Sequence, residues 1–117
     1  MNSIEDIRDY HAHIYYDTRS KNPAESLRKG MEDLFPKASF GRWHDYPVGP
    51  HPNGSFQIEF ETELFQPIIS YLALNRGDLV VFVHPNTGDA LIDHRDYAIW
   101  MGEKRELNLK SLERPDS

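Results

Sequence analysis

Hydrophobic and polar residues alternate in some stretches of the chain and recur with helical spacing in others. Residues 10–16, YHAHIYY, and residues 55–60, SFQIEF, both alternate with a period of two. That period is typical of a strand with one buried face. Residues 79–84, LVVFVH, are the most β-branched run and predict another strand. Residues 37–44, KASFGRWH, predict a fourth, which Gly41 weakens.

Two other stretches have helical spacing. Asn22 and Pro23 suit the cap and the first position of a helix that Pro36 stops. Its apolar stripe comprises Ala24, Leu27, Met31, Leu34 and Phe35. A second helix is predicted to begin near Thr62 and to end at Gly77. Its apolar face comprises Phe65, Ile68, Ile69 and Leu72.

The remaining segments have weaker patterns. Residues 1–8 are predicted to be a loose leader, and residues 45–53, DYPVGPHPN, to be irregular because of their prolines. Residues 86–89, NTGD, predict a turn. Residues 90–101 fit a short strand, a helical turn or both, and the segment 103–117 is predicted to be a polar, extended tail.

The order of these elements predicts the fold class. It is an α+β, ferredoxin-like βαββαβ sandwich with an antiparallel sheet and two helices on one face. We expect the first and third strands to lie side by side and parallel, with the fourth antiparallel beside the first. The other sheet face must then meet solvent, a ligand or another subunit, so a homodimer is expected. Residues 1–117 are expected to form one domain, with a core over about residues 10–105.

Composition excludes several classes of function. The formal net charge of −6 argues against nucleic-acid binding through a basic face. The chain has no cysteine, so a metal must be held by His, Asp, Glu or water. No run approaches the ~20 apolar residues of a membrane span, and the acidic N-terminus is unlike a signal peptide. The expected location is therefore the cytoplasm.

Several histidines converge in the expected sheet. His11 begins the first strand, His51 precedes the third and His84 ends the fourth, so all three fall at the same end. His13 lies one pleat further in and shares the face of His11, away from the helices. These four side chains, with Glu59 nearby, make a nitrogen and oxygen donor set that suits Fe(II), Zn, Mn or Ni. The alternative is an ordinary solvated strand face, with His44 and His94 as surface or hydrogen-bonded residues.

Four stretches of the chain resemble the DOPA 4,5-dioxygenase family, small proteins of fungi and bacteria. They are residues 10–17 (YHAHIYYD), 41–60, 72–91 and 93–102, and together they span nearly the whole chain. PVGPHP, VHPNTGD and DHRD within them are far more specific in combination than singly.

The resemblance implies a ferredoxin-like subunit, usually paired. It implies extradiol cleavage of a catechol ring by non-haem Fe(II) and O₂, with zinc or another divalent metal as an alternative in the purified protein. The histidines of the family correspond to His11, His13, His51 and His84. The bound partners are then a catechol and O₂, and the physiological catechol is left open.

Such chemistry needs a metal with open positions, so the protein holds only about three sites. Our hypothesis places His11, His13 and His84 on the metal and gives His51 the acid/base role, for which an imidazole pKa of ~6.5 is suited. An exchange of roles between His51 and any of the other three stays open, including one in which only one of His11 and His13 binds the metal and the other handles protons. Glu59 is the reserve carboxylate ligand.

Substrate contacts are predicted at several positions. Arg42, Arg76 and Arg95 can each pair bidentately with a substrate carboxylate, the alternative being surface or structural salt bridges. His44 and Tyr15 are predicted to line the catechol pocket. Trp43 and Trp100 are expected in core or interface packing, and Asp93 and Asp96 in the DHRD turn.

Two other functions remain open at this point. One is a non-catalytic, dimeric ferredoxin-like module that binds a small ligand or a metal through its open sheet face. The other keeps the metal but performs hydrolysis or isomerisation. Stoichiometric metal and oxygen uptake would distinguish the dioxygenase from both.

Overall fold

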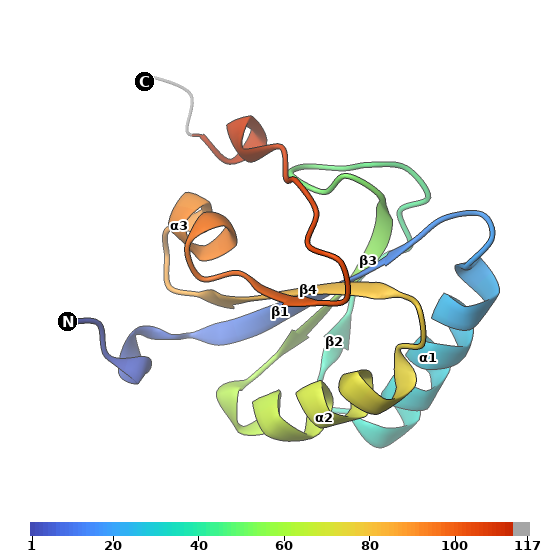
Figure 1. The fold of residues 1–117 in the computed structure, drawn as a ribbon. Coiled ribbons are helices and arrows are strands. Elements are labelled where there is room, and N and C mark those ends of the chain that lie inside the picture. The colour runs from blue at the N-terminus through green and yellow to red at the C-terminus, as the bar shows by residue number, and fades with distance from the viewer. Residues whose placement is uncertain (114–117) are drawn as a thin grey trace.

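The computed structural model describes residues 1–113 and contains five strands and three α-helices in that range. In chain order these are β1 (Asp9–Tyr16), α1 (Lys21–Leu34), β2 (Ser39–Phe40), β3 (Gly54–Phe60), α2 (Phe65–Asn75), β4 (Val80–Asn86), α3 (Ala90–Arg95) and β5 (Ile99–Met101). Short 3₁₀ helices occupy Ile4–Asp6, Thr62–Leu64 and Leu109–Leu112. The predicted βαββαβ order is therefore confirmed, and α3 and β5 follow it (Figure 1).

The strands form one antiparallel sheet in the order β2-β3-β1-β4-β5. β4 lies antiparallel beside β1, as expected, but β3 also runs antiparallel to β1, with Tyr10 opposite Phe60 and Tyr16 opposite Gly54. The expectation of parallel first and third strands was wrong. The reason is that α1 returns the chain across the sheet, so β2 runs in the direction of β1. Its antiparallel partner β3 must then oppose β1.

Helices α1 and α2 cover one face of this sheet (Figure 1). Alternate residues of the strands point toward them, because side chains in a strand alternate between the two faces. The resulting core includes Ala12, Ile14, Leu27, Met31, Phe56, Ile58, Ile68, Leu72, Val81 and Val83. The predicted stripes of both helices are thus largely confirmed. Leu34 is the exception, since it is exposed and the next residue, Phe35, packs against the core instead.

The ends of the elements differ from the prediction in detail. α1 begins at Lys21, so Pro23 is its third residue rather than its first, and Ser20 is the N-cap in place of Asn22. After α2, Gly77 has φ +56°, a left-handed conformation that glycine adopts without strain. The strand predicted over residues 37–44 shortens to β2.

The second face of the sheet is covered rather than bare. Tyr15, Val80 and Phe82 form a smaller apolar cluster there with Ala98, Trp100 and Leu107. Residues 90–101 are both a helix and a strand, and Leu107 brings the segment after Glu103 onto the sheet. The described part of the tail is therefore not simply polar and extended, and residues 114–117 lie outside the described range. Pairing of subunits stays a prediction, but an open face no longer argues for it.

The N-terminal leader is partly ordered. The leader contains a 3₁₀ helix at Ile4–Asp6, in which Ser3 and Asp6 form a capping box. Within residues 1–113, no helix combines the length and the apolar character needed to cross a membrane.

Truncation of two leucines of α2 should affect stability very differently. Leu72 is 0% exposed, whereas Leu74 is 85% exposed. We expect Leu72→Ala to lower the free energy of unfolding by about 2–5 kcal/mol, because it removes buried methyl groups and leaves a cavity. Leu74→Ala should change it by less than ~0.5 kcal/mol. Urea unfolding measures both, and equal effects would contradict the assignment of the buried face.

Candidate metal centre

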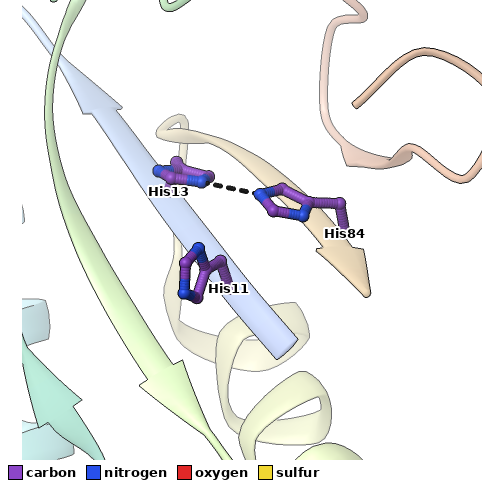
Figure 2. Close-up of side chains that lie close together, drawn as sticks. All are labelled: His11, His13 and His84. Atoms are coloured by element: carbon purple, nitrogen blue, oxygen red, sulfur yellow. Dashed lines mark hydrogen bonds between the residues drawn. The ribbon is translucent and has the colours of Figure 1, made fainter. Parts of the chain in front are cut away.

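Strand pairing places three histidines together on the face opposite α1 and α2. His11 lies directly across from His84 in the pairing of β1 with β4, and His13 follows on the same face of β1. The ring centroids are 5.3 Å apart for His11 and His84, 5.2 Å for His13 and His84, and 5.8 Å for His11 and His13. Figure 2 shows the three rings turned toward a common point.

The separations of the ring nitrogens fit a single ion. One nitrogen from each of His11, His13 and His84 lies within 4.8 Å of the others. The two Nε2 atoms of His13 and His84 are 3.1 Å apart (Figure 2). Two nitrogens bound at right angles to one ion at ~2.1 Å would lie ~3.0 Å apart. The His13–His84 pair therefore already has the spacing of two neighbouring ligands.

The backbone orients His84 for this role. Its Nδ1 lies 3.0 Å from the carbonyl oxygen of Pro85. A carbonyl only accepts hydrogen bonds, so Nδ1 carries the proton and Nε2 turns its lone pair toward His13. Metal-binding histidines commonly donate their second N–H in this way, which fixes the ring and raises its basicity.

Burial keeps these imidazoles neutral. His13 is 4% exposed and His84 is 0% exposed. Burial lowers the pKa of His84 to about 3 and holds the pKa of His13 well below its usual range, with the neighbouring histidines adding to both effects. Burial also lowers the pKa of the half-buried His11. Neutral nitrogens without sulfur form a donor set that suits Fe(II) or Zn, so a divalent metal fits here.

His51 reaches the cluster by a different route from the one expected. Because β3 is antiparallel to β1, β3 begins at the Tyr16 end of the sheet. The loop that contains His51 therefore joins the sheet at the end away from His11. The loop then folds over the second face, so that the His51 ring lies 4.1 Å from that of His13. The expected meeting of His51 with the other histidines is correct, but the reason given for it, a parallel third strand, is wrong.

Three residues hold the His51 loop in place. The Tyr15 hydroxyl is 2.8 Å from His51 Nδ1. Farther along the chain, the Asn108 amide donates to the Pro50 carbonyl at 2.8 Å, and Arg105 donates to the Asn53 side chain. Burial lowers the pKa of His51 to about 4, helped by His94 and His44.

His94 is a fifth member of the cluster that sequence reasoning missed. Its ring lies 4.0 Å from that of His84 and 6.3 Å from that of His13. Its Nδ1 donates to the Ala90 carbonyl at 2.6 Å, so Nε2 is the nitrogen left for a ligand or substrate. His94 was expected to be a surface or hydrogen-bonded residue, and it is hydrogen-bonded. The sequence did not predict α3, which places His94 over the sheet.

Glu59 lies beside this group rather than in it. It pairs with His11 across β1 and β3, and its Oε2 is 3.8 Å from His11 Nε2. The neighbouring carboxyl of Asp9 raises the pKa of Glu59. Asp9, His11 and Glu59 form a second group with metal-ligand spacing, which shares His11 with the histidine triad. Glu59 is thus an alternative partner of His11.

Of the predicted substrate residues, Tyr15 and Arg76 line one cavity, whereas Arg42, His44 and Arg95 lie outside it. Arg42 and His44 are exposed, and His44 forms an isolated bridge with Ser55. Arg95 is exposed and pairs with Asp96. Arg76 donates to the carbonyl of Leu79 at the turn between α2 and β4. These contacts match the alternative of surface and structural bonds.

Four other side chains have the structural roles that were expected, with one change. Trp43 packs against Phe56 at 4.7 Å between ring centroids, and Trp100 stacks on Phe82 at 4.6 Å. Asp93 accepts hydrogen bonds from the amide and hydroxyl of Thr87, at 2.9 and 2.6 Å. Asp96 instead pairs with Arg95.

Comparison with known proteins agrees with this geometry. The model of the Dopa 4,5-dioxygenase family matches residues 10–111. The chain belongs to this family. It is 36% identical over 117 residues to a DOPA 4,5-dioxygenase from Amanita muscaria, covering 92% of this chain and 50% of that protein. It is 37% identical over 116 residues to an uncharacterized 21.2 kDa protein from Botryotinia fuckeliana, covering 90% and 63%.

A protein of known structure has nearly the same fold. The crystal structure of a protein from Nostoc punctiforme, provisionally described as a dioxygenase, superposes with a TM-score of 0.93 at 39% identity and covers 96% of each chain. The curated fungal relatives are longer, since the chain spans 50% of one and 63% of the other. Membership of the Dopa 4,5-dioxygenase family confirms the resemblance drawn from the motifs and supports an oxygenase.

The lowered histidine pKa values predict a loss of stability in acid. Unfolded imidazoles bind protons near pH 6.5, whereas His51 and His84 bind them near 4 and 3 in the folded protein. Between these values the unfolded state holds more protons, so stability falls as the pH drops. We expect the free energy of unfolding to fall by about 1 kcal/mol per pH unit for each buried imidazole as the pH drops from 6 to 5. Urea unfolding of chelator-treated protein measures this.

Two substitutions isolate this effect. His84→Gln should make the dependence on pH shallower, whereas His44→Gln should change it much less, because His44 is exposed and is only a minor cause of the lowered pKa of His51. A free energy of unfolding that stays constant or rises between pH 6 and 5 would refute the assignment of neutral buried histidines.

The triad predicts which substitution abolishes metal binding. His84→Ala removes the Nε2 atom that lies 3.1 Å from His13 Nε2, in a ring that the Pro85 carbonyl orients. We expect Fe(II) or Zn bound after anaerobic loading and gel filtration to fall from stoichiometric to near zero. His44→Ala should retain the metal. Elemental analysis gives the content, and an unchanged content in a folded His84→Ala protein would exclude this ligand set.

Proposed function

We propose that the protein is an extradiol catechol dioxygenase whose Fe(II) is held by His11, His13 and His84. The observation that carries this proposal is the triad of imidazole nitrogens within 4.8 Å of one another in a chain of the Dopa 4,5-dioxygenase family. Three protein ligands would leave the ion with open positions. When bound, Fe(II) would bind the catechol and O₂ and so bring the two reactants together.

The protein residues then have to orient the catechol and manage its protons. In extradiol cleavage O₂ and catechol are consumed one for one, both oxygen atoms enter the product, and the ring carbon–carbon bond beside the diol breaks. A catechol gives up hydroxyl protons when it binds a metal, so the site needs a group that exchanges protons or hydrogen bonds with its oxygens. His51 and His94 are the two cluster members outside the triad.

Tyr15 sets the hydrogen-bonding state of His51. The Tyr15 side chain is buried, and in residues 1–113 its hydroxyl has His51 Nδ1 as its hydrogen-bond partner, at 2.8 Å. A buried hydroxyl that does not donate is costly, so it donates to Nδ1. The proton of the neutral imidazole is therefore on Nε2. His51 in this tautomer is a hydrogen-bond donor rather than a metal ligand.

This assignment separates the roles that the sequence left open. His13 lies in the triad with His84, which favours it as a ligand. His51 presents an N–H next to it and can donate to a substrate oxygen as charge develops there. We propose His51 as the hydrogen-bond donor to this developing charge and Tyr15 as the residue that positions it, so that Tyr15 supports catalysis rather than contacting the ring.

Oxygen uptake tests the activity directly. Protein loaded with Fe(II) under anaerobic conditions should, on addition of a catechol and air, consume O₂ and form a yellow semialdehyde. His51→Ala should lower kcat by about 10²–10³-fold while keeping the iron, because it removes a hydrogen-bond donor and no ligand. Tyr15→Phe should also lower kcat, and it should shift the pH profile because the tautomer of His51 is no longer fixed.

Controls distinguish this activity from the other functions. His44→Gln should retain turnover. Iron bound in stoichiometric amount without oxygen uptake, across neutral, acidic and amino-acid catechols, would sink the proposal and favour a binding module. Product formation without O₂ consumption would point to hydrolysis or isomerisation at the same metal.

A further inference from the structure

A cavity of about 550 Å³ lies at the end of β1 that is farther from His11. It is lined by the turn after β1, the turn between α2 and β4, and two side chains from the second face, Asn53 and Arg105, and it is open to solvent on one side. Tyr15 forms part of its wall. The volume is in the range of ~300–1,000 Å³ that small-molecule sites occupy.

Positive charge exceeds negative charge in the lining. Arg19, Arg76 and Arg105 face two carboxylates, those of Asp17 and Asp78. This excess stands out in a chain whose net charge is −6. The carboxylate of Asp17 already accepts hydrogen bonds from the Ser20 hydroxyl and from the amides of Arg19 and Ser20.

Two of the three guanidinium groups, those of Arg76 and Arg105, are held in place without being neutralised. Arg76 donates to the Leu79 carbonyl at 3.0 Å, and its guanidinium packs so closely against Gly102 that a Cβ there would lie 2.9 Å from Nη1. Arg105 donates to the Asn53 amide oxygen. Within residues 1–113, neither these two nor Arg19 forms a salt bridge with a carboxylate. Fixed and unpaired guanidiniums favour a planar anion such as a carboxylate.

The cavity also adjoins His51, the proposed hydrogen-bond donor. The hydroxyl of Tyr15, in the cavity wall, lies 2.8 Å from His51 Nδ1. Asn53, which Arg105 holds, follows His51 by two residues in the same loop. A carboxylate bound at Arg105 would therefore lie one side chain away from His51, which is itself next to His13.

We propose that this cavity binds a carboxylate of the substrate, with Arg105 as its main partner, so that the preferred catechols carry an acidic side chain. The inference rests on the proposed dioxygenase function for the catechol part. The binding of the carboxylate is a property of the cavity alone.

Binding to the metal-free, full-length protein tests the carboxylate site without activity. The probes are 3,4-dihydroxyphenylacetate and its methyl ester, which differ in charge at one end only. We expect the acid to bind the wild-type protein at least about tenfold more tightly than the ester, because a charge-assisted, bidentate contact is lost in the ester. Arg105→Gln should remove this preference, and Arg105→Lys should retain part of it.

Lys104→Gln is the matched control, because it removes the same charge from an exposed neighbouring residue. It should leave the preference for the acid unchanged. Equal affinities for acid and ester in the wild-type protein, no binding of either, or a preference that survives Arg105→Gln would each overturn the carboxylate site. Circular dichroism confirms that each variant is folded.

Turnover separates this inference from the proposed function. If the acid binds through Arg105 but iron-loaded protein consumes no O₂, the dioxygenase proposal fails and the carboxylate site stands. If O₂ is consumed with equal KM for acid and ester in the wild-type and Arg105→Gln proteins, the activity stands and the carboxylate site is wrong.

Discussion

The register between β1 and β4 is the constraint on which the site depends. It sets His11 directly opposite His84, with His13 on the same face. A slip of one residue would turn these imidazoles into the helix-covered core and bring Ala12 and Ile14 to the second face. The burial of Ile14, Val81 and Val83 against α1 and α2 opposes such a slip. Packing on one side of the sheet thus fixes the geometry of the donor atoms on the other.

The histidines on the second face are covered by a layer made of the His51 loop and the segment that contains Arg105 and Asn108. Hydrogen bonds anchor this layer at several points. Its His51 loop begins at Asp45, which accepts hydrogen bonds from Tyr16 and Lys21, and its far end is held by the segment that contains Arg105 and Asn108. These ties keep water from the histidines, and burial is the first cause of the lowered pKa of each of them. Neutral imidazoles with fixed tautomers follow from this layer as much as from the strands.

Local patterns in the sequence predicted most of the elements, because period-two and helical spacing reflect which face of each element is buried. They did not give the direction of β3, which depends on how α1 and β2 cross the sheet. They also gave no structure for residues 90–101, so His94 was not recognised as part of the cluster. Arg105 was missed for a related reason. It meets Asn53 because the segment after β5 crosses the sheet, and no periodic pattern in the sequence predicts that course.

The His51 loop links the two parts of the proposed reaction. His51 is oriented at Nδ1 by Tyr15, and two residues later Asn53 is held by Arg105. An anion bound at Arg105 would compete with Asn53 for the donors of one guanidinium, or share them, since that group has five N–H bonds. In either case the bound anion acts on the segment that sets the distance between His51 and His13. Recognition of an acidic side chain and placement of the His51 hydrogen-bond donor would then be one event, so a substrate without the charge would lose turnover as well as affinity.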